Sequence, residues 1–146
     1  MKNTIAVAAV LSVLFACQGN HTDYKTVRDE VMEFHDVVMA DHGSIVKNQM
    51  KLDTLLKDMA ALKKADPALD TLTARQQMLI LKAELLKAED GMNDWMHKFE
   101  PDVTGKSNAE SVAYFEAEKR KIVKIDSIYK KEIAMSNSYL TQFSKR

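Results

Sequence analysis

The stretch YKTVRDEVMEFHDVVMADHGSIVKNQMKLDTLLKDMAAL, residues 24–62, decides the fold of this 146-residue chain. Steps of alternately three and four residues along it meet an apolar side chain at ten of twelve positions. The twelve positions are Tyr24, Val27, Val31, Phe34, Val38, Asp41, Ile45, Asn48, Leu52, Leu55, Met59 and Leu62. This spacing puts the apolar residues on one face of an α-helix and predicts a helix from about Asp23 to Lys64. Asp41 and Asn48 interrupt the face, and buried polar residues of this kind can fix the register between helices.

Two more stretches with the same spacing follow. Asp66-Pro67 predicts a stop and a restart, because Pro at a first helical position needs no backbone donor and Asp66 can cap it. The apolar face of this second helix comprises Ala74, Met78, Leu81, Leu85, Ala88, Met92, Trp95 and Phe99. Pro101 ends the helix, and Ser107-Asn108-Ala109-Glu110 matches the capping box that starts a third one. The third face comprises Val112, Phe115, Ile122, Tyr129, Ile133, Leu140 and Phe143, with Lys119, Asp126 and Ser136 at the remaining positions.

These patterns predict an all-α fold. Three amphipathic helices with short turns indicate an elongated antiparallel three-helix bundle, coiled-coil-like and up-down-up in topology. The composition agrees, since the chain has only four Gly and two Pro, and no strand-type alternation of useful length competes. Gly43 lies inside the first predicted helix and leaves two alternatives open. The helix either continues through it or breaks there, with Ser44 capping a new helix.

The N-terminus predicts a membrane anchor. Lys2 precedes an uncharged run of eleven residues, from Ile5 to Phe15, which has the length of a signal-peptide core and is too short to span a bilayer. The run ends in Leu14-Phe15-Ala16-Cys17, which resembles the lipobox of bacterial lipoproteins. Residues 1–16 are then a lipoprotein signal peptide, 17–22 the acylated Cys17 with a tether, and 23–146 the helical domain. An ordinary secretory signal and an uncleaved N-terminal helix are the alternatives.

Cys17 is the only cysteine and therefore has no partner for an internal disulfide. Acyl chains on this residue explain its presence, because two or more chains give stable membrane anchoring. Gln18 follows it, where Asp would signal retention in the inner membrane. We therefore expect a protein of the cell envelope at the outer membrane, facing either the periplasm or the exterior.

Charge and motifs exclude several classes of function. The chain has 21 basic and 21 acidic residues. It therefore lacks the surplus of positive charge that is typical of nucleic-acid-binding proteins. It has no Gly-rich phosphate loop and no haem-attachment motif, and the di-iron motif is approximated only once, by Asp94-Trp95-Met96-His97. No small-molecule substrate is evident, and the sequence predicts no enzyme.

A stripe of methionine and histidine is the one chemical feature beyond the helical pattern. Antiparallel pairing of the first two helices brings together His35, Met39, His42, Met92, Met96 and His97. Thioether and imidazole ligands suit Cu(I), so these six residues are candidate metal ligands. In the alternative interpretation, which the pattern favours, no cofactor is bound and the methionines fill gaps in the core beside Trp95.

Two segments, residues 29–39 and 92–101, resemble small helical lipoproteins of Bacteroidetes-type bacteria, which are often labelled viral A-type inclusion proteins. The resemblance implies an envelope location and an all-helical fold, and it implies no catalytic residue. We expect a lipid-anchored, non-catalytic structural or interaction protein with a protein partner in the envelope. A copper-binding module and a chaperone-like binder of envelope proteins are the alternatives. An apolar strip left exposed outside the core is the feature that the first hypothesis requires.

Overall fold

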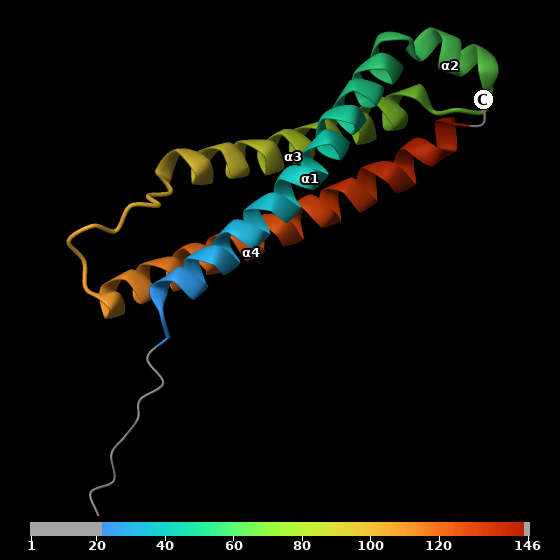
Figure 1. Ribbon diagram of the computed structural model, residues 1–146. Coiled ribbons are helices and arrows are strands. Elements are labelled where there is room, and N and C mark those ends of the chain that lie inside the picture. The colour runs from blue at the N-terminus through green and yellow to red at the C-terminus, as the bar shows by residue number, and fades with distance from the viewer. Residues whose placement is uncertain (1–21, 145–146) are drawn as a thin grey trace, which may run out of the picture.

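A computed structural model describes residues 22–144, and the predicted signal peptide and Cys17 lie outside this range. The prediction of an all-helical fold is confirmed, since the described residues form helices joined by turns, without a strand. The helices are α1 (Tyr24–Lys57), α2 (Met59–Ala65), α3 (Thr71–Lys98) and α4 (Asn108–Leu140), followed by the 3-10 turn η1 (Thr141–Phe143). Figure 1 shows an elongated molecule in which α1, α3 and α4 lie along one another, while α2 lies at the end where α4 finishes.

The prediction of one helix over residues 23–64 is wrong at its C-terminal end. Asp58 leaves helical geometry, with φ −121° and ψ 47°, and separates α1 from α2. Its carboxylate accepts a hydrogen bond from the Ala61 amide at 3.2 Å, so the same residue ends one helix and caps the next. The apolar spacing continues across Asp58 to Met59 and Leu62, which is why periodicity alone did not reveal the break.

The start of the next long helix also differs from the prediction. Asp66 follows α2 as its C-cap and does not begin a helix at Pro67. Asp70 caps α3 instead, accepting hydrogen bonds from the amides of Leu72 (3.0 Å) and Thr73 (3.3 Å). A hydrogen bond from the Thr73 hydroxyl, together with these two backbone bonds, lowers the pKa of Asp70. The predicted capping box of Ser107 and Glu110 is confirmed at the start of α4.

Helix α1 continues through Gly43, so the alternative of a break at this position is wrong. Glycine inside a helix costs about 1 kcal/mol relative to alanine. A Cβ atom added at Gly43 meets no atom within 4 Å. Packing among the described residues therefore gives no reason for glycine here.

Cross-helix contacts define the directions of the three long helices. Between α1 and α4, Glu30 contacts Lys119 and Asn48 contacts Ser136, so residue numbers rise together and the helices are parallel. Between α1 and α3, Gln49 contacts Glu89 and Asp53 contacts Lys82, so these helices are antiparallel. Helix α3 therefore runs opposite to both of its neighbours, as Figure 1 shows.

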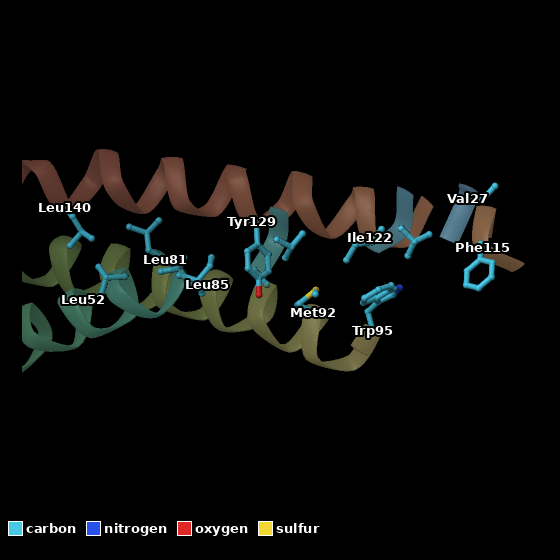
Figure 2. Close-up of a cluster of buried hydrophobic side chains, with 14 of the residues drawn as sticks. Val27, Leu52, Leu81, Leu85, Met92, Trp95, Phe115, Ile122, Tyr129 and Leu140 are labelled. Atoms are coloured by element: carbon cyan, nitrogen blue, oxygen red, sulfur yellow. The ribbon is translucent and has the colours of Figure 1, made fainter. Parts of the chain in front are cut away.

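The core is a line of apolar side chains between the three long helices (Figure 2). Fully or almost fully buried members from α1 and α3 are Val27, Val31, Val38, Ile45, Leu52, Met78, Leu85 and Met92. Helix α4 adds Phe115, Ile122 and Tyr129, each with 0% of its surface exposed. All of these residues occupy positions that the alternation of three and four residues predicted. Burial of each large apolar side chain contributes about 1.5–3 kcal/mol to folding.

Helix α4 buries more polar groups than its sequence pattern indicated. Glu118 is buried and Lys119 is not, although Lys119 occupied the predicted position. Glu118 accepts a hydrogen bond from Trp95 Nε1 at 2.9 Å and pairs with Lys121 at 2.6 Å. Lys119 instead reaches Glu30 on α1 at 2.6 Å. The polar position that the pattern assigned to Lys119 is therefore taken by Glu118, and both residues make polar contacts across helices.

Asn48 forms a buried polar contact between α1 and α4. Its side-chain amide donates to Ser136 Oγ at 2.8 Å and to Asn137 Oδ1 at 2.9 Å. Asn48 is 2% exposed and Ser136 is fully buried, so water does not replace these bonds when one partner is removed. The contact sits among apolar layers, where a shift of α4 along α1 would leave the amide without partners.

We expect Asn48→Ala to lower the free energy of unfolding by about 1–3 kcal/mol, because it removes both hydrogen bonds and leaves a cavity. Asn48→Leu fills the same volume with apolar atoms and should be close to neutral in stability, while it loosens the register between helices. Urea denaturation measures the first effect and amide hydrogen exchange across α4 the second. Equal stability of the wild type and Asn48→Ala would contradict a structural role for this contact.

Candidate interaction surface

The predicted metal ligands on α1 face different surroundings. His35 is half-buried, with Nδ1 at 2.9 Å from Asp36 Oδ1 and its ring centroid 6.2 Å from that of Trp95. Met39 is exposed at 38% of its surface. His42 is half-buried, with Nδ1 at 3.4 Å from Tyr129 Oη. The two histidines therefore contact different residues.

The candidates on α3 are spread from the core to the surface. Met92 is 1% exposed and belongs to the core, and Met96 packs against the core while half-buried. His97 is exposed, and its Nδ1 lies 2.7 Å from the carbonyl oxygen of Asn93, one turn earlier. Residues 22–144 contain no group of three or more His, Cys, Asp or Glu side chains placed to hold a metal ion. A site built from Met and His together stays a prediction.

Sequence reasoning did not identify the polar cluster around His42. Its Nε2 lies 3.9 Å from Glu89 Oε1 on α3, and its ring stacks on Tyr129 of α4 with centroids 6.5 Å apart. Burial, and secondarily the charge of Glu89, raise the pKa of Tyr129 to about 12. The phenol is therefore protonated at neutral pH. The cluster joins all three long helices midway along the molecule.

The most exposed large apolar side chains of α3 form a second apolar strip outside the core. We call Leu72, Leu79, Ile80 and Leu86 the α3 strip. Their exposed fractions are 68%, 47%, 56% and 40%. The three leucines recur every seven residues, which places them along one line of the helix. Gln76 and Ala83 lie between them at steps of four and three residues.

This spacing is that of a coiled-coil surface. Inside the molecule, α3 already buries its first apolar face, from Ala74 to Trp95, against α1 and α4. The α3 strip therefore has no covering helix among residues 22–144. Exposed apolar side chains aligned along a helix, unlike ones scattered singly, are typical of protein-interaction sites. The sequence did carry a signal for it in the heptad recurrence of leucine at positions 72, 79 and 86.

Basic side chains border the α3 strip on its exposed sides. Arg75 is exposed and forms no ion pair among the described residues, and Lys87 is exposed with Glu84 at 3.8 Å. Lys82 is held by Asp53 of α1. A partner with acidic side chains beside an apolar line therefore complements this surface.

None of the described helices is long and apolar enough to cross a bilayer. Comparison of the chain with protein-family models, with curated proteins and with solved structures finds no match. The geometry of the described residues and the sequence are therefore the basis for assigning a function.

The raised pKa of Tyr129 predicts how stability changes at high pH. In the unfolded chain the phenol ionises near pH 10, while in the folded chain it ionises near 12. The unfolded state is thus favoured increasingly between these values, and the free energy of unfolding should fall as pH rises from 10 to 12. Tyr129→Phe should make this fall smaller, measured by urea denaturation at pH 8 and pH 11.

Tyr114→Phe is the matched control, because Tyr114 is only half-buried at the end of the molecule and Tyr129 stays in place. An identical alkaline loss of stability in wild type and Tyr129→Phe would contradict the burial of this phenol. Spectrophotometric titration supplies an independent measurement, since Tyr129→Phe should remove the phenol that ionises last.

Proposed function

We propose that this chain is a lipid-anchored, non-catalytic protein of the cell envelope that binds another protein through the α3 strip. The exposed apolar line of Leu72, Leu79 and Leu86 is the observation that carries the proposal. An interaction protein needs such a surface outside its own core. The neutral net charge and the sequence motifs are consistent with a protein partner.

The proposed architecture is an elongated, coiled-coil-like bundle of α1, α3 and α4 in up-down-up order. Its support is the steps of three and four residues between buried side chains on each long helix. Helix α2 closes the end opposite the first turn of α1. Such a bundle has a long surface in proportion to its core, which suits docking along its length.

The proposed anchor lies at one end of this bundle. Asn108, at the start of α4, accepts a hydrogen bond from the Tyr24 amide at 3.0 Å and donates to the Thr22 carbonyl at 2.9 Å. The start of α1 is thereby held beside the α3–α4 connection. With Cys17 acylated, this end is the one tethered to the bilayer. The α3 strip begins near the opposite end, at Leu72, and runs towards the tethered end.

The proposed partner presents an amphipathic helix with acidic residues beside its apolar face. The α3 strip supplies the apolar line, and Arg75 and Lys87 supply positive charge at its edges. Helix-in-groove and coiled-coil partners are recognised in this way, by apolar anchors every three or four residues. A chaperone-like role would use the same surface for many unrelated segments and is separated from the first role by the experiment below.

Site-specific photocrosslinking in intact cells tests this surface. A photoreactive residue at Gln76 should give one dominant adduct with another protein, because this position lies between Leu72 and Leu79 on the α3 strip. Leu72→Gln with Leu86→Gln should abolish the adduct while the stability of the domain changes by less than about 1 kcal/mol, since these side chains are exposed. Mass spectrometry of the adduct should identify a peptide with apolar residues at steps of three and four and acidic flanks.

The control is the same photoreactive residue at Lys124, which is exposed on α4 and forms no ion pair among the described residues. Ile128→Gln with Met135→Gln is the matched substitution control, because these two α4 residues are also exposed and seven residues apart. Equal adducts from positions 76 and 124 would refute the assignment to α3. A spread of many adducts at position 76 would favour the chaperone-like role.

Metabolic labelling tests the anchor. Labelled palmitate should appear in the wild-type chain and vanish in Cys17→Ala, because Cys17 is the only cysteine available for acylation. The envelope fraction should contain the wild type, and the variant should leave the membrane after a salt wash. Cys17→Ala that still incorporates palmitate would overturn the lipobox interpretation. Ser12→Ala, in the apolar run, is the matched control and should be labelled like the wild type.

A further inference from the structure

Helix α1 has an apolar outer face that is separate from the α3 strip. Met32, Val37, Met39 and Met50 are exposed at 37%, 39%, 38% and 66%. Two shallow grooves run along this face of the single helix. The first is lined by residues between Asp29 and Ala40, and the second by residues between Gly43 and Thr54. Together they follow α1 for most of its length, on the side turned away from Val31, Val38 and the other core residues.

The charges on this face change sign at its middle. Asp29, Glu33 and Asp36 lie on the N-terminal half, where Lys25 in the first turn of α1 is an exception. Lys47, Lys51 and Lys57 lie on the C-terminal half. The three lysines form no ion pair among residues 22–144, and Glu33 has no hydrogen-bond partner there either. Asp29 and Asp36 contact only their neighbours Arg28 and His35. The face is therefore electrostatically complementary to the same face of a second copy that runs antiparallel to it.

Gly43 lies at the point where the charge changes sign. It is exposed inside a continuous helix, and a Cβ atom there would meet open space. Its conformational cost is not balanced by any packing within the described residues. A second helix that crosses α1 at this point could approach its backbone closely, because no side chain intervenes.

We propose that a second copy of this chain binds this face, with the two α1 helices antiparallel and the twofold axis at Gly43. Residue numbers that face each other then add up to about 86. Asp29 of one copy lies opposite Lys57 of the other, and Asp36 lies between Lys47 and Lys51. Met39 of each copy lies opposite Val46 of the other copy. The twofold axis produces this contact twice, once on either side of the paired glycines. Each of the three lysines on the C-terminal half thereby lies near an acidic side chain.

The same charges exclude a parallel pair. Parallel α1 helices would place three acidic residues against three acidic residues and three lysines against three lysines, and like charges in direct apposition are unfavourable. These charges also favour a second copy over an unrelated partner, because the face itself contains both an acidic half and the basic half that complements it. The antiparallel order in addition aligns the two helix dipoles favourably.

Charge reversal in the full chain tests the proposal. The wild type, purified in a mild detergent, should form a dimer in sedimentation equilibrium that weakens as salt is raised. Glu33→Lys with Asp36→Lys makes both halves basic and should raise the dimer dissociation constant on the order of tenfold. Lys47→Glu with Lys51→Glu makes both halves acidic and should raise the dimer dissociation constant to the same extent. All four substitutions together reverse the polarity of the face and should restore the dimer.

Gly43→Ala supplies a second, independent readout. The variant should raise the melting temperature of the helical domain, because alanine is the better helix former and its Cβ meets no intramolecular atom. It should at the same time weaken the dimer, because the methyl group separates the two backbones. A destabilised domain would be the usual result of damage to the fold, so the opposite signs of the two effects identify an intermolecular role.

Lys124→Asp, on the outer side of α4, is the control and should leave the dimer unchanged. A chain that stays monomeric at every concentration overturns the proposal, and so does a dimer that the combined four substitutions fail to restore. The result is independent of the α3 strip, since Leu72→Gln with Leu86→Gln should leave this dimer intact.

Discussion

Each long helix of this chain has one face that its neighbours can cover, because side chains that recur at steps of three and four residues span only a narrow strip of a helix. On α1 the covered face includes Val31, Val38 and Ile45. On α3 it includes Met78, Leu85 and Met92. The exposed apolar residues elsewhere on these helices, such as Met50 and Leu72, have no described helix to pack against. The exposed side chains of α1 and α3 are therefore a direct consequence of the arrangement that buries the others. In this molecule, the geometry of the core determines where exposed apolar side chains lie.

The same regularity explains how much of the fold could be predicted. The buried positions followed from spacing alone, since an apolar seam repeats with the helical period. The helix ends did not, because they depend on which of several aspartates caps a helix. Asp58, Asp66 and Asp70 are all suitable N-caps by residue type, and only the path of the chain selects Asp58 and Asp70. The predicted register of α4 was wrong by one residue at this point, since Glu118 is buried where Lys119 was expected. A hydrogen bond from Trp95 to Glu118 makes burial of this carboxylate tolerable.

The candidate surfaces were harder to derive from the sequence than the core. Antiparallel pairing did place His35 in the region of Trp95, but it could not show that Met92 turns inwards while His97 turns outwards. The leucines at 72, 79 and 86 recur every seven residues, but they were not identified from the sequence. Their meaning depended on the knowledge that Met78 and Leu85, one residue earlier in each turn, already fill the core. A second seam on a helix can be recognised only after the first one has been assigned.

The proposed anchor and the proposed antiparallel contact together constrain how the molecule lies on a membrane. Nineteen residues separate Tyr24 from Gly43, so the two α1 helices of a dimer begin roughly 57 Å apart at a rise of about 1.5 Å per residue. A tether of six residues, 17–22, spans at most about 22 Å. An upright dimer could therefore attach only one of its two acylated ends to a bilayer. Both ends reach the same bilayer only when the dimer lies along it. The α3 strip belongs to a different helix from the paired faces, so it stays available to a second protein in this arrangement.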